Sequence, residues 1–261
     1  MMRRSAAAAA VALLLAAAAT RAEGPAGEAV AYKHGDTQLE GWLVLPEGKA
    51  KAGVLVVHEW WGHNDYARKR AAQLARLGYA AFALDMYGKG VVTDDPAKAK
   101  EQATKFYSDR KLMRDRAAAG LAVLKDKAKT DVLGAIGYCF GGTVVLELAR
   151  SGADVRGVVS FHGGLGTPKP EDAKNIKGKV LVCHGADDGF ISPEELAGFE
   201  KEMRDAKVDW QLVKYGGSVH SFTSPEADKR GMAGVAYNEK ADHRSWKAME
   251  QFFAEAFGAA K

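Results

Sequence analysis

Short apolar runs alternate along this chain with longer segments that carry apolar residues at every third or fourth position. The apolar runs predict strands over residues 38–45, 54–59, 80–85, 131–136, 157–161, 180–184 and 209–213. The amphipathic segments predict helices over residues 64–77, 95–108, 110–127, 142–150, 193–206 and 239–257. Largely apolar strands in alternation with helices are typical of a mostly parallel sheet with helices on both faces. Because no linker or repeat separates these elements, we expect a single α/β domain.

The first 22 residues have the pattern of a secretory signal peptide. Two arginines precede an apolar run at 6–19, and a small-x-small cleavage pattern follows at 20–22. The run holds 14 residues, fewer than the roughly 20 that a membrane-spanning helix needs. We therefore predict a signal peptide at 1–22, a mature domain at 23–261 and a periplasmic or secreted protein. An uncleaved anchor or a disordered alanine tract is the alternative.

The predicted leader also carries most of the basic excess of the chain. It holds three arginines and no acidic residue, so its removal lowers the formal charge from +4 to +1. A nearly neutral domain lacks the basic excess typical of proteins that bind nucleic acid or an anionic membrane. We expect no nucleic-acid partner, and no membrane association once the leader is cleaved.

A nucleophile elbow is the first candidate for chemistry. Gly137-Tyr138-Cys139-Phe140-Gly141 lies between a predicted strand and a predicted helix. A sharp strand-to-helix turn exposes one side chain at the edge of the sheet, and glycines flank it because a Cβ would collide with nearby backbone. The pattern predicts a reactive Cys139 thiol, although the same five residues also occur in packed turns without chemistry.

Two later strand ends supply partners for that thiol. The loop after 180–184 holds Asp187 and Asp188, and the loop after 209–213 holds His220. Nucleophile, acid and histidine follow in the chain order of α/β-hydrolase triads. His220 would take the thiol proton, and either aspartate would orient its ring.

An acyl-transfer site also needs donors for the oxyanion. We predict the backbone N–H of Phe140, directly after the nucleophile, and that of Trp60, in the loop after strand 54–59. Trp60 and Trp61 either line a pocket or pack in the core.

Two other interpretations of the motifs are weaker. His58-Glu59-Trp60-Trp61-Gly62-His63 has one residue more than the zinc motif HExxH, and it leaves a strand instead of lying on a helix. We expect no metal. A Cys139–Cys183 disulfide is disfavoured because an intervening strand would hold the cysteines about 10 Å apart, whereas a bridge needs Cα atoms within roughly 7 Å. Cys183 is expected to be a small core residue.

Together these motifs resemble the dienelactone hydrolases, cysteine members of the α/β-hydrolase fold. The resemblance extends from about residue 32 to 257. The segments that carry it are Val57–Gly62, Leu84–Tyr87, Ile136–Gly142, Gly185–Ile191 and His220–Phe222. It implies the α/β-hydrolase fold and assigns Asp188 as the acid in place of Asp187. It also implies that Glu59 holds the resting thiol protonated until substrate arrives.

The sequence departs from the family pattern at two substrate-binding positions. Lys89 stands where the prototypes have an arginine that binds the dienelactone carboxylate, and Ser224 replaces a second arginine. Lysine keeps a charge without the bidentate fork, and serine keeps no charge. The resemblance to the family therefore supports the type of reaction more strongly than it supports the family's substrate. We expect substrate contacts from Trp61, Tyr87, Lys89 and Phe222.

The combined prediction is a monomeric hydrolase that needs no cofactor and cleaves a small ester or lactone through a thioester on Cys139. One alternative is a redox or peroxide-sensing thiol protein, for which Cys183 would have to resolve oxidised Cys139. Another is a binding protein without catalysis.

Overall fold

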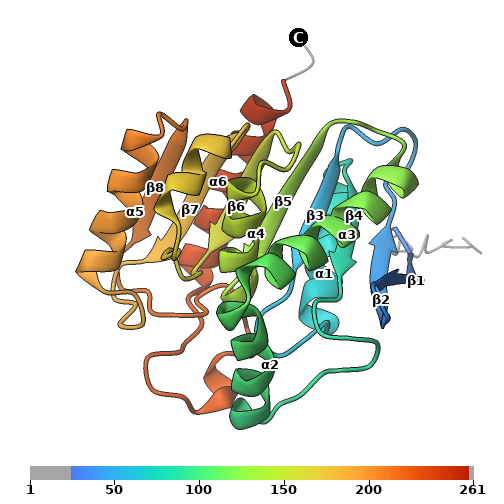
Figure 1. Ribbon diagram of the computed structural model, residues 1–261. Coiled ribbons are helices and arrows are strands. Elements are labelled where there is room, and N and C mark those ends of the chain that lie inside the picture. The colour runs from blue at the N-terminus through green and yellow to red at the C-terminus, as the bar shows by residue number, and fades with distance from the viewer. Residues whose placement is uncertain (1–24, 259–261) are drawn as a thin grey trace, which may run out of the picture.

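An eight-stranded sheet forms the centre of residues 25–258, the part of the chain that the computed structural model describes (Figure 1). Its strand order is β1-β2-β4-β3-β5-β6-β7-β8. The strands are β1 (Gly27–His34), β2 (Thr37–Val44), β3 (Gly53–Val57), β4 (Ala80–Leu84), β5 (Leu133–Tyr138), β6 (Gly157–Phe161), β7 (Lys179–Gly185) and β8 (Trp210–Tyr215). β1 and β2 form an antiparallel hairpin at one edge, and all pairs from β4 to β8 are parallel.

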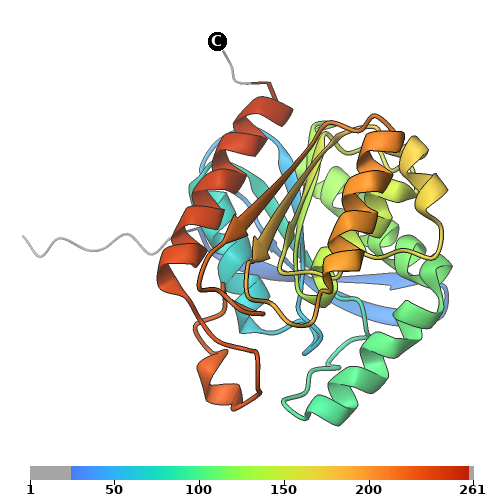
Figure 2. The ribbon, with the colours of Figure 1, turned by 90° about the vertical axis from the view of Figure 1, so that its left-hand side faces the viewer.

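Helices cover both faces of the sheet, as the apolar strands require. They are α1 (Asp65–Arg76), α2 (Pro96–Ser108), α3 (Arg110–Ala128), α4 (Phe140–Arg150), α5 (Pro193–Asp205) and α6 (Glu239–Ala256), with 3₁₀ turns η1 (Pro170–Asn175) and η2 (Asp228–Arg230). α1 and α6 pack on one face, and α3, α4 and α5 on the other (Figure 2). Alternate residues of β3 serve the two layers: Val54 and Val56 join the α1/α6 core, and Leu55 and Val57 join the other.

The predicted single α/β domain with a mostly parallel sheet is confirmed. Each predicted strand and helix is present, with ends displaced by up to about two residues. The sequence does not predict β1, because this strand lies at the sheet edge with every residue partly or fully exposed and so lacks an apolar run.

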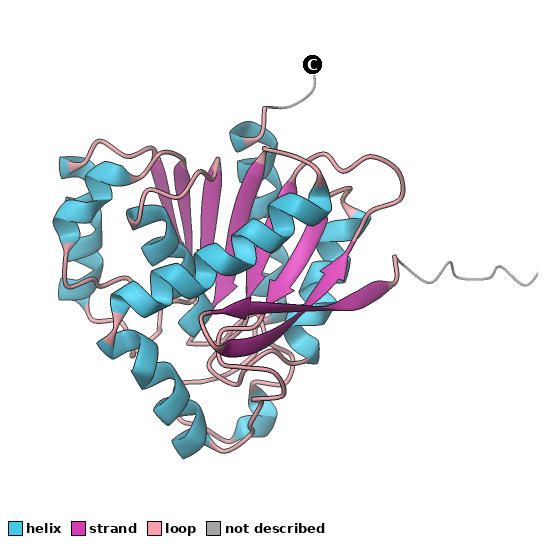
Figure 3. Cartoon of the chain, turned by 45° about the vertical axis from the view of Figure 1, so that its right-hand side comes forward, coloured by secondary structure: helices cyan, strands magenta, loops and turns pink. Residues whose placement is uncertain are grey.

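The strand order determines where chemistry can gather. β3 has β4 on one side and β5 on the other. After β4 the chain therefore crosses to the other side of β3, where β5 to β8 follow in order. Ligands of open α/β sheets bind at the carboxyl ends of strands where the order reverses in this way. Those ends point to the lower side of Figure 3, where long loops gather. α2 and η2 both project beyond the sheet on that side (Figure 1).

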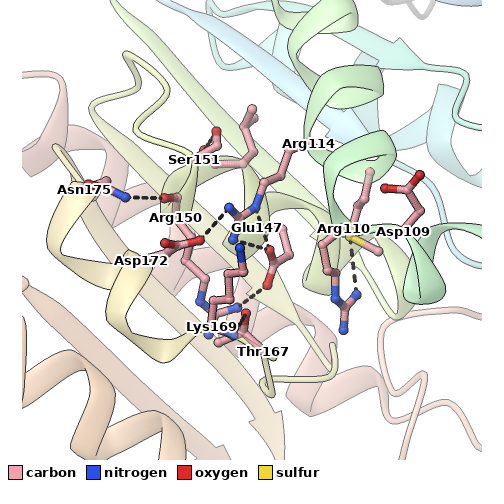
Figure 4. A network of polar contacts seen from close by, with 12 residues as sticks. Asp109, Arg110, Arg114, Glu147, Arg150, Ser151, Thr167, Lys169, Asp172 and Asn175 are labelled. Carbon is pink, nitrogen blue, oxygen red and sulfur yellow. Dashed lines mark hydrogen bonds and ion pairs between the residues drawn. The ribbon is translucent and has the colours of Figure 1, made fainter.

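A buried network of ion pairs holds the C-terminal end of α4 (Figure 4). Arg150, which is fully buried, donates to both carboxylate oxygens of Glu202 at 2.7 and 2.8 Å and to Glu147 at 3.1 Å. Arg114 joins Glu147 at 2.8 Å and Asp172 at 2.6 Å. The network connects α3, α4, α5 and η1, and so anchors the helix that begins at the elbow.

The predicted signal peptide lies outside the described residues and stays a prediction. Within residues 25–258, each helix is too short or too polar to cross a bilayer.

Candidate active site

The elbow has the geometry that its glycines predict. Cys139 follows β5 and precedes α4 with φ of 52°, a left-handed conformation that is uncommon for a residue with a side chain. A Cβ on Gly137 would lie 1.9 Å from the Gly141 carbonyl oxygen, and one on Gly141 would lie 2.3 Å from the Val57 oxygen. Only glycine fits at both positions, so the backbone can turn sharply and present the Cys139 side chain at the sheet edge.

Asp188 and His220 meet at this edge from the ends of β7 and β8. The Nδ1 atom of His220 lies 2.9 Å from Oδ2 of Asp188, whose side chain is fully buried. Asp187 is exposed, so the geometry agrees with Asp188 as the partner of the histidine. Burial alone lowers the pKa of His220, but the Cys139 thiolate and the Asp188 carboxylate outweigh it and raise the pKa to about 10. The environment thus favours a protonated His220.

Glu59 shares a cavity with the same thiol, and its carboxylate is hydrogen-bonded to another residue. It lines a cavity together with Cys139, and its Oε1 accepts a hydrogen bond from the Ser221 hydroxyl at 3.0 Å. Burial raises the pKa of Glu59, and the bond from Ser221 opposes this rise. Among the described residues, Ser221 is its one side-chain hydrogen-bond partner.

The two predicted oxyanion donors lie on adjacent strand ends. Within the described chain, neither the Trp60 N–H nor the Phe140 N–H has an acceptor. Phe140 opens α4, where the first N–H groups have no partner in the helix. Tyr87 donates its hydroxyl to the Trp60 carbonyl oxygen at 3.1 Å and thereby holds the loop that carries the Trp60 N–H.

Two cavities meet at Cys139, and Phe190 and His220 also line both of them. The first, the apolar cavity, has a volume of about 150 Å³. Its further lining residues include Trp60, Trp61, Ala227, Arg230, Met232 and Val235. The second, the polar cavity, has a volume of about 410 Å³. Its further lining residues include Tyr107, Arg110, Thr143, Gly164, Gly166 and Glu195. The thiol therefore faces an apolar chamber on one side and a polar chamber on the other.

The four predicted substrate contacts do not all reach these cavities. Trp61 lines the apolar cavity, whereas Tyr87, Lys89 and Phe222 line neither. Lys89 is largely exposed and forms an ion pair with Glu40 at 2.7 Å. Tyr87 acts on Trp60 as described, and Phe222 is buried. These three residues thus lie outside both cavities, and their contact with substrate stays a prediction.

Sequence reasoning missed much of the lining, including Tyr107, Arg110 and Arg230. Tyr107, at the end of α2, and Arg110, at the start of α3, enter the polar cavity from the segment that overhangs the strand ends. Arg230, from η2, places its guanidinium 3.9 Å from the ring centre of Trp61 and pairs with Asp94 at 2.7 Å. No motif marks them, since each depends on how a loop folds over the sheet.

Both cysteines are free. In the sheet, β6 lies between β5, which precedes Cys139, and β7, which contains Cys183. Cys183 is fully buried, and burial raises its pKa to about 12, which makes it unreactive. Within residues 25–258, no group of three or more His, Cys, Asp or Glu side chains is arranged to hold a metal. His58 instead accepts the Met86 N–H at 3.2 Å.

The chain is similar to known proteins in sequence and in fold. The model of the Dienelactone hydrolase family matches residues 39–257. A crystal structure of a dienelactone hydrolase-like promiscuous phosphotriesterase from metagenomic libraries is 41% identical, with a TM-score of 0.86 over 90% of this chain and 100% of that chain. A putative carboxymethylenebutenolidase of Aquifex aeolicus is 26% identical over 87% of this chain and 97% of its own length. A probable 2-oxo-3-(5-oxofuran-2-ylidene)propanoate lactonase of Bradyrhizobium is 31% identical over 65% of this chain and 72% of its own length.

Proposed function

Because this chain belongs to the dienelactone hydrolase family, and is therefore an ester or lactone hydrolase, we propose that it cleaves its substrate through a thioester on Cys139. The observation that carries the proposal is the 2.9 Å contact between His220 and the buried Asp188, in a site where His220 and Cys139 line the same two cavities. A thiol, an imidazole and a carboxylate in this relation can exchange one proton and form one covalent bond.

The steps follow from these groups. The Cys139 thiolate attacks the acyl carbon, and the N–H groups of Trp60 and Phe140 stabilise the oxyanion. When the tetrahedral intermediate collapses, the C–O bond breaks and the His220 imidazolium gives its proton to the leaving alkoxide. His220 then takes a proton from water, whose hydroxide attacks the thioester. The carboxylic acid leaves, and the thiolate–imidazolium pair is restored.

Glu59 is proposed to regulate the thiol. Its pKa is raised by burial, so it binds a proton more readily than an exposed carboxylate, and it lines the apolar cavity with Cys139. A proton shared between Glu59 and the thiol in the empty site would protect the sulfur, because the thiolate is the form that oxidises.

The two cavities suggest an ester with unequal halves. A compact apolar half would occupy the chamber beside Trp61, and a larger hydrogen-bonding half the chamber beside Thr143 and Glu195. Any anionic group would meet Arg230 or Arg110 in place of Lys89. With an anionic aryl ester, Arg230→Met should raise KM severalfold, and the matched variant Lys89→Met should leave KM unchanged.

The decisive experiment uses purified protein comprising residues 23–261 and a panel of activated aryl esters and unsaturated lactones. We expect turnover by wild type and by Cys183→Ala, and loss of turnover in Cys139→Ala and His220→Ala. Mass spectrometry of the quenched reaction should find the acyl group on the peptide that contains Cys139. Wild-type turnover in both Cys139→Ala and His220→Ala would refute the mechanism.

Aryl phosphotriesters are a second class of substrate to test with the same variants. The solved structure that is 41% identical is described as a promiscuous phosphotriesterase. We propose that neutral aryl phosphotriesters are secondary substrates. The same thiolate attacks phosphorus, the P–O bond to the aryl group breaks as His220 protonates the leaving aryloxide, and water then hydrolyses the P–S bond to release the phosphodiester. Phosphotriester turnover that persists in Cys139→Ala would exclude this use of the site.

Export is proposed from residues 1–22 alone. N-terminal sequencing of the mature protein from a bacterial host should begin near residue 23. A protein that retains residue 1 and stays in the cell interior would exclude export.

A further inference from the structure

His162 lies directly behind the reacting groups and has no place in the mechanism above. It follows β6 and is fully buried. Its Nδ1 lies 3.2 Å from the backbone nitrogen of Cys139, and its Nε2 lies 2.7 Å from the Thr223 hydroxyl. Its ring also packs edge-on against His220, with 5.3 Å between ring centres. One side chain thus contacts the elbow (residues 137–141) and the histidine loop (residues 216–223).

The contacts determine which nitrogen of His162 carries the proton. The Cys139 N–H donates to both Phe161 O, at 3.0 Å, and His162 Nδ1, so Nδ1 is an acceptor. The proton therefore sits on Nε2, which donates to the Thr223 hydroxyl. His162 must be neutral to make both bonds. Burial lowers its pKa strongly, and the nearby charges of His220, Arg70 and His184 lower it further.

Beyond Thr223 the bonds continue into two helices. The Thr223 hydroxyl lies 2.7 Å from that of Tyr66 in α1, which also receives Arg70 Nε at 3.2 Å. Arg70 donates to the Thr223 carbonyl oxygen at 2.7 Å and to Asp242 of α6 at 2.6 Å. The histidine loop is therefore held to α1 and α6, and His162 is the link from this rigid frame to the elbow.

Backbone strain marks the same place. Among the described residues, five that are not glycine have positive φ. Lys129 and Lys207 lie just beyond helix ends, where this conformation is common. The other three are Cys139 at 52°, His162 at 42° and Ser221 at 57°. Such strain persists only where surrounding contacts hold it, and it concentrates at functional sites.

We propose that His162 is a positioning residue that holds the elbow and the histidine loop in register, so that the Cys139 sulfur and the His220 ring stay in contact through the reaction. This role rests on the proposed function, because it serves the Cys139–His220 pair. It acts through the N–H of Cys139 on one side and the hydroxyl of Thr223 on the other. His162 itself exchanges no proton with substrate.

The test compares variants that remove one contact or both. His162→Phe keeps the ring and loses both bonds, and we expect kcat to fall at least about tenfold with KM nearly unchanged, since small misplacements of reacting groups are costly. His162→Asn restores an acceptor near Nδ1 and should recover part of the loss. Thr223→Val should also lower kcat. The double variant His162→Phe/Thr223→Val should be little worse than His162→Phe, because the two residues act through one bond.

A readout without substrate separates positioning from mere stability. Alkylation by iodoacetamide at pH 7 should slow severalfold in His162→Phe, because His220 no longer lies where it stabilises the thiolate, the form of the thiol that reacts. A looser fold would instead leave the rate unchanged or raise it by exposing the thiol. The matched control is His63→Phe, a buried histidine whose Nε2 has no partner among the described residues. It should lose stability without slower alkylation.

Two results would overturn the proposal. One is wild-type alkylation and kcat within about twofold in folded His162→Phe. The other applies if that variant does not fold: a wild-type alkylation rate and a wild-type kcat in both His162→Asn and Thr223→Val. Failure of the proposed function is a separate result: hydrolysis would survive Cys139→Ala, while the alkylation comparison would still measure the register of the two loops.

Discussion

Removing the arginine at the centre of the buried network should cost more stability than removing any surface ion pair. Arg150 is fully buried, and its guanidinium satisfies both oxygens of Glu202. Figure 4 shows the part of the network formed by Arg150, Glu147, Arg114 and Asp172. The substitution Arg150→Met keeps much of the side-chain length and packing. It leaves the Glu202 carboxylate with no cation within 4 Å in the described part of the chain, since Arg114 reaches only Glu147 and Asp172.

The magnitude of the loss follows from the free energy of protonating the Glu202 carboxylate, which removes its buried charge. An ordinary glutamic acid has a pKa of about 4.3, so protonating one at pH 7 costs about 4 kcal/mol. This agrees with the 3–5 kcal/mol typical of breaking a buried pair by removing one partner. For a domain of this size, about 4 kcal/mol lowers Tm by about 8–16 °C. Exposed pairs such as Lys111–Asp115 contribute much less, because water screens both charges.

Urea denaturation of wild type and Arg150→Met at pH 7 and pH 5 measures this loss. Because protonation becomes cheaper by about 1.4 kcal/mol per pH unit, the deficit should shrink to about 1 kcal/mol at pH 5. Arg150→Met/Glu202→Leu removes both charges and should recover at least half of the loss at pH 7. A deficit below about 1 kcal/mol at pH 7, or one that is the same at both pH values, would refute the reasoning.

Three further predictions concern the site. Asp188→Asn should lower kcat by about 10³–10⁴-fold with little change in Tm, because His220 loses its orienting acceptor; a loss under tenfold would contradict this role. Glu59→Gln keeps an acceptor for Ser221 and removes a buried charge. Burial raises the pKa of Glu59, so this carboxyl binds a proton more tightly in the folded protein than in the unfolded chain. The stability of wild type therefore falls as the pH rises through the pKa that Glu59 has in the folded protein. The Gln variant should therefore gain Tm over wild type at pH 8 and not at pH 5, and an equal difference at both pH values would contradict the shift. Tyr87→Phe should lower kcat severalfold at constant KM, because the loop of Trp60 loses its hydrogen bond; unchanged kcat would show that the loop holds without it.

Features with local causes were readable from the sequence. The apolar runs at 54–59, 80–85 and 157–161 are strands because their side chains must be buried on both faces of a sheet, whatever their neighbours. The elbow was readable for a similar reason, since only glycine tolerates the contacts at Gly137 and Gly141. The edge strand β1 was not, because partial exposure weakens its pattern.

Pairings between distant loops had no local cause. Asp188 was chosen over Asp187 by family resemblance, and in the fold it is the buried member that meets His220. The hydrogen bond from Ser221 to Glu59 joins residues 162 positions apart and leaves no trace in either segment.

The sequence alone determined the alternation of strands and helices, the family and the order of the candidate reacting groups, because each depends on residues close in the chain. The tertiary structure decided which side chains share a cavity. It placed Lys89 outside both cavities, in an ion pair with Glu40, and brought Arg230 and His162 to the site. The reason is geometric: side-chain direction at a strand end depends on how the following loop crosses the sheet, and that path is set by packing across the whole domain.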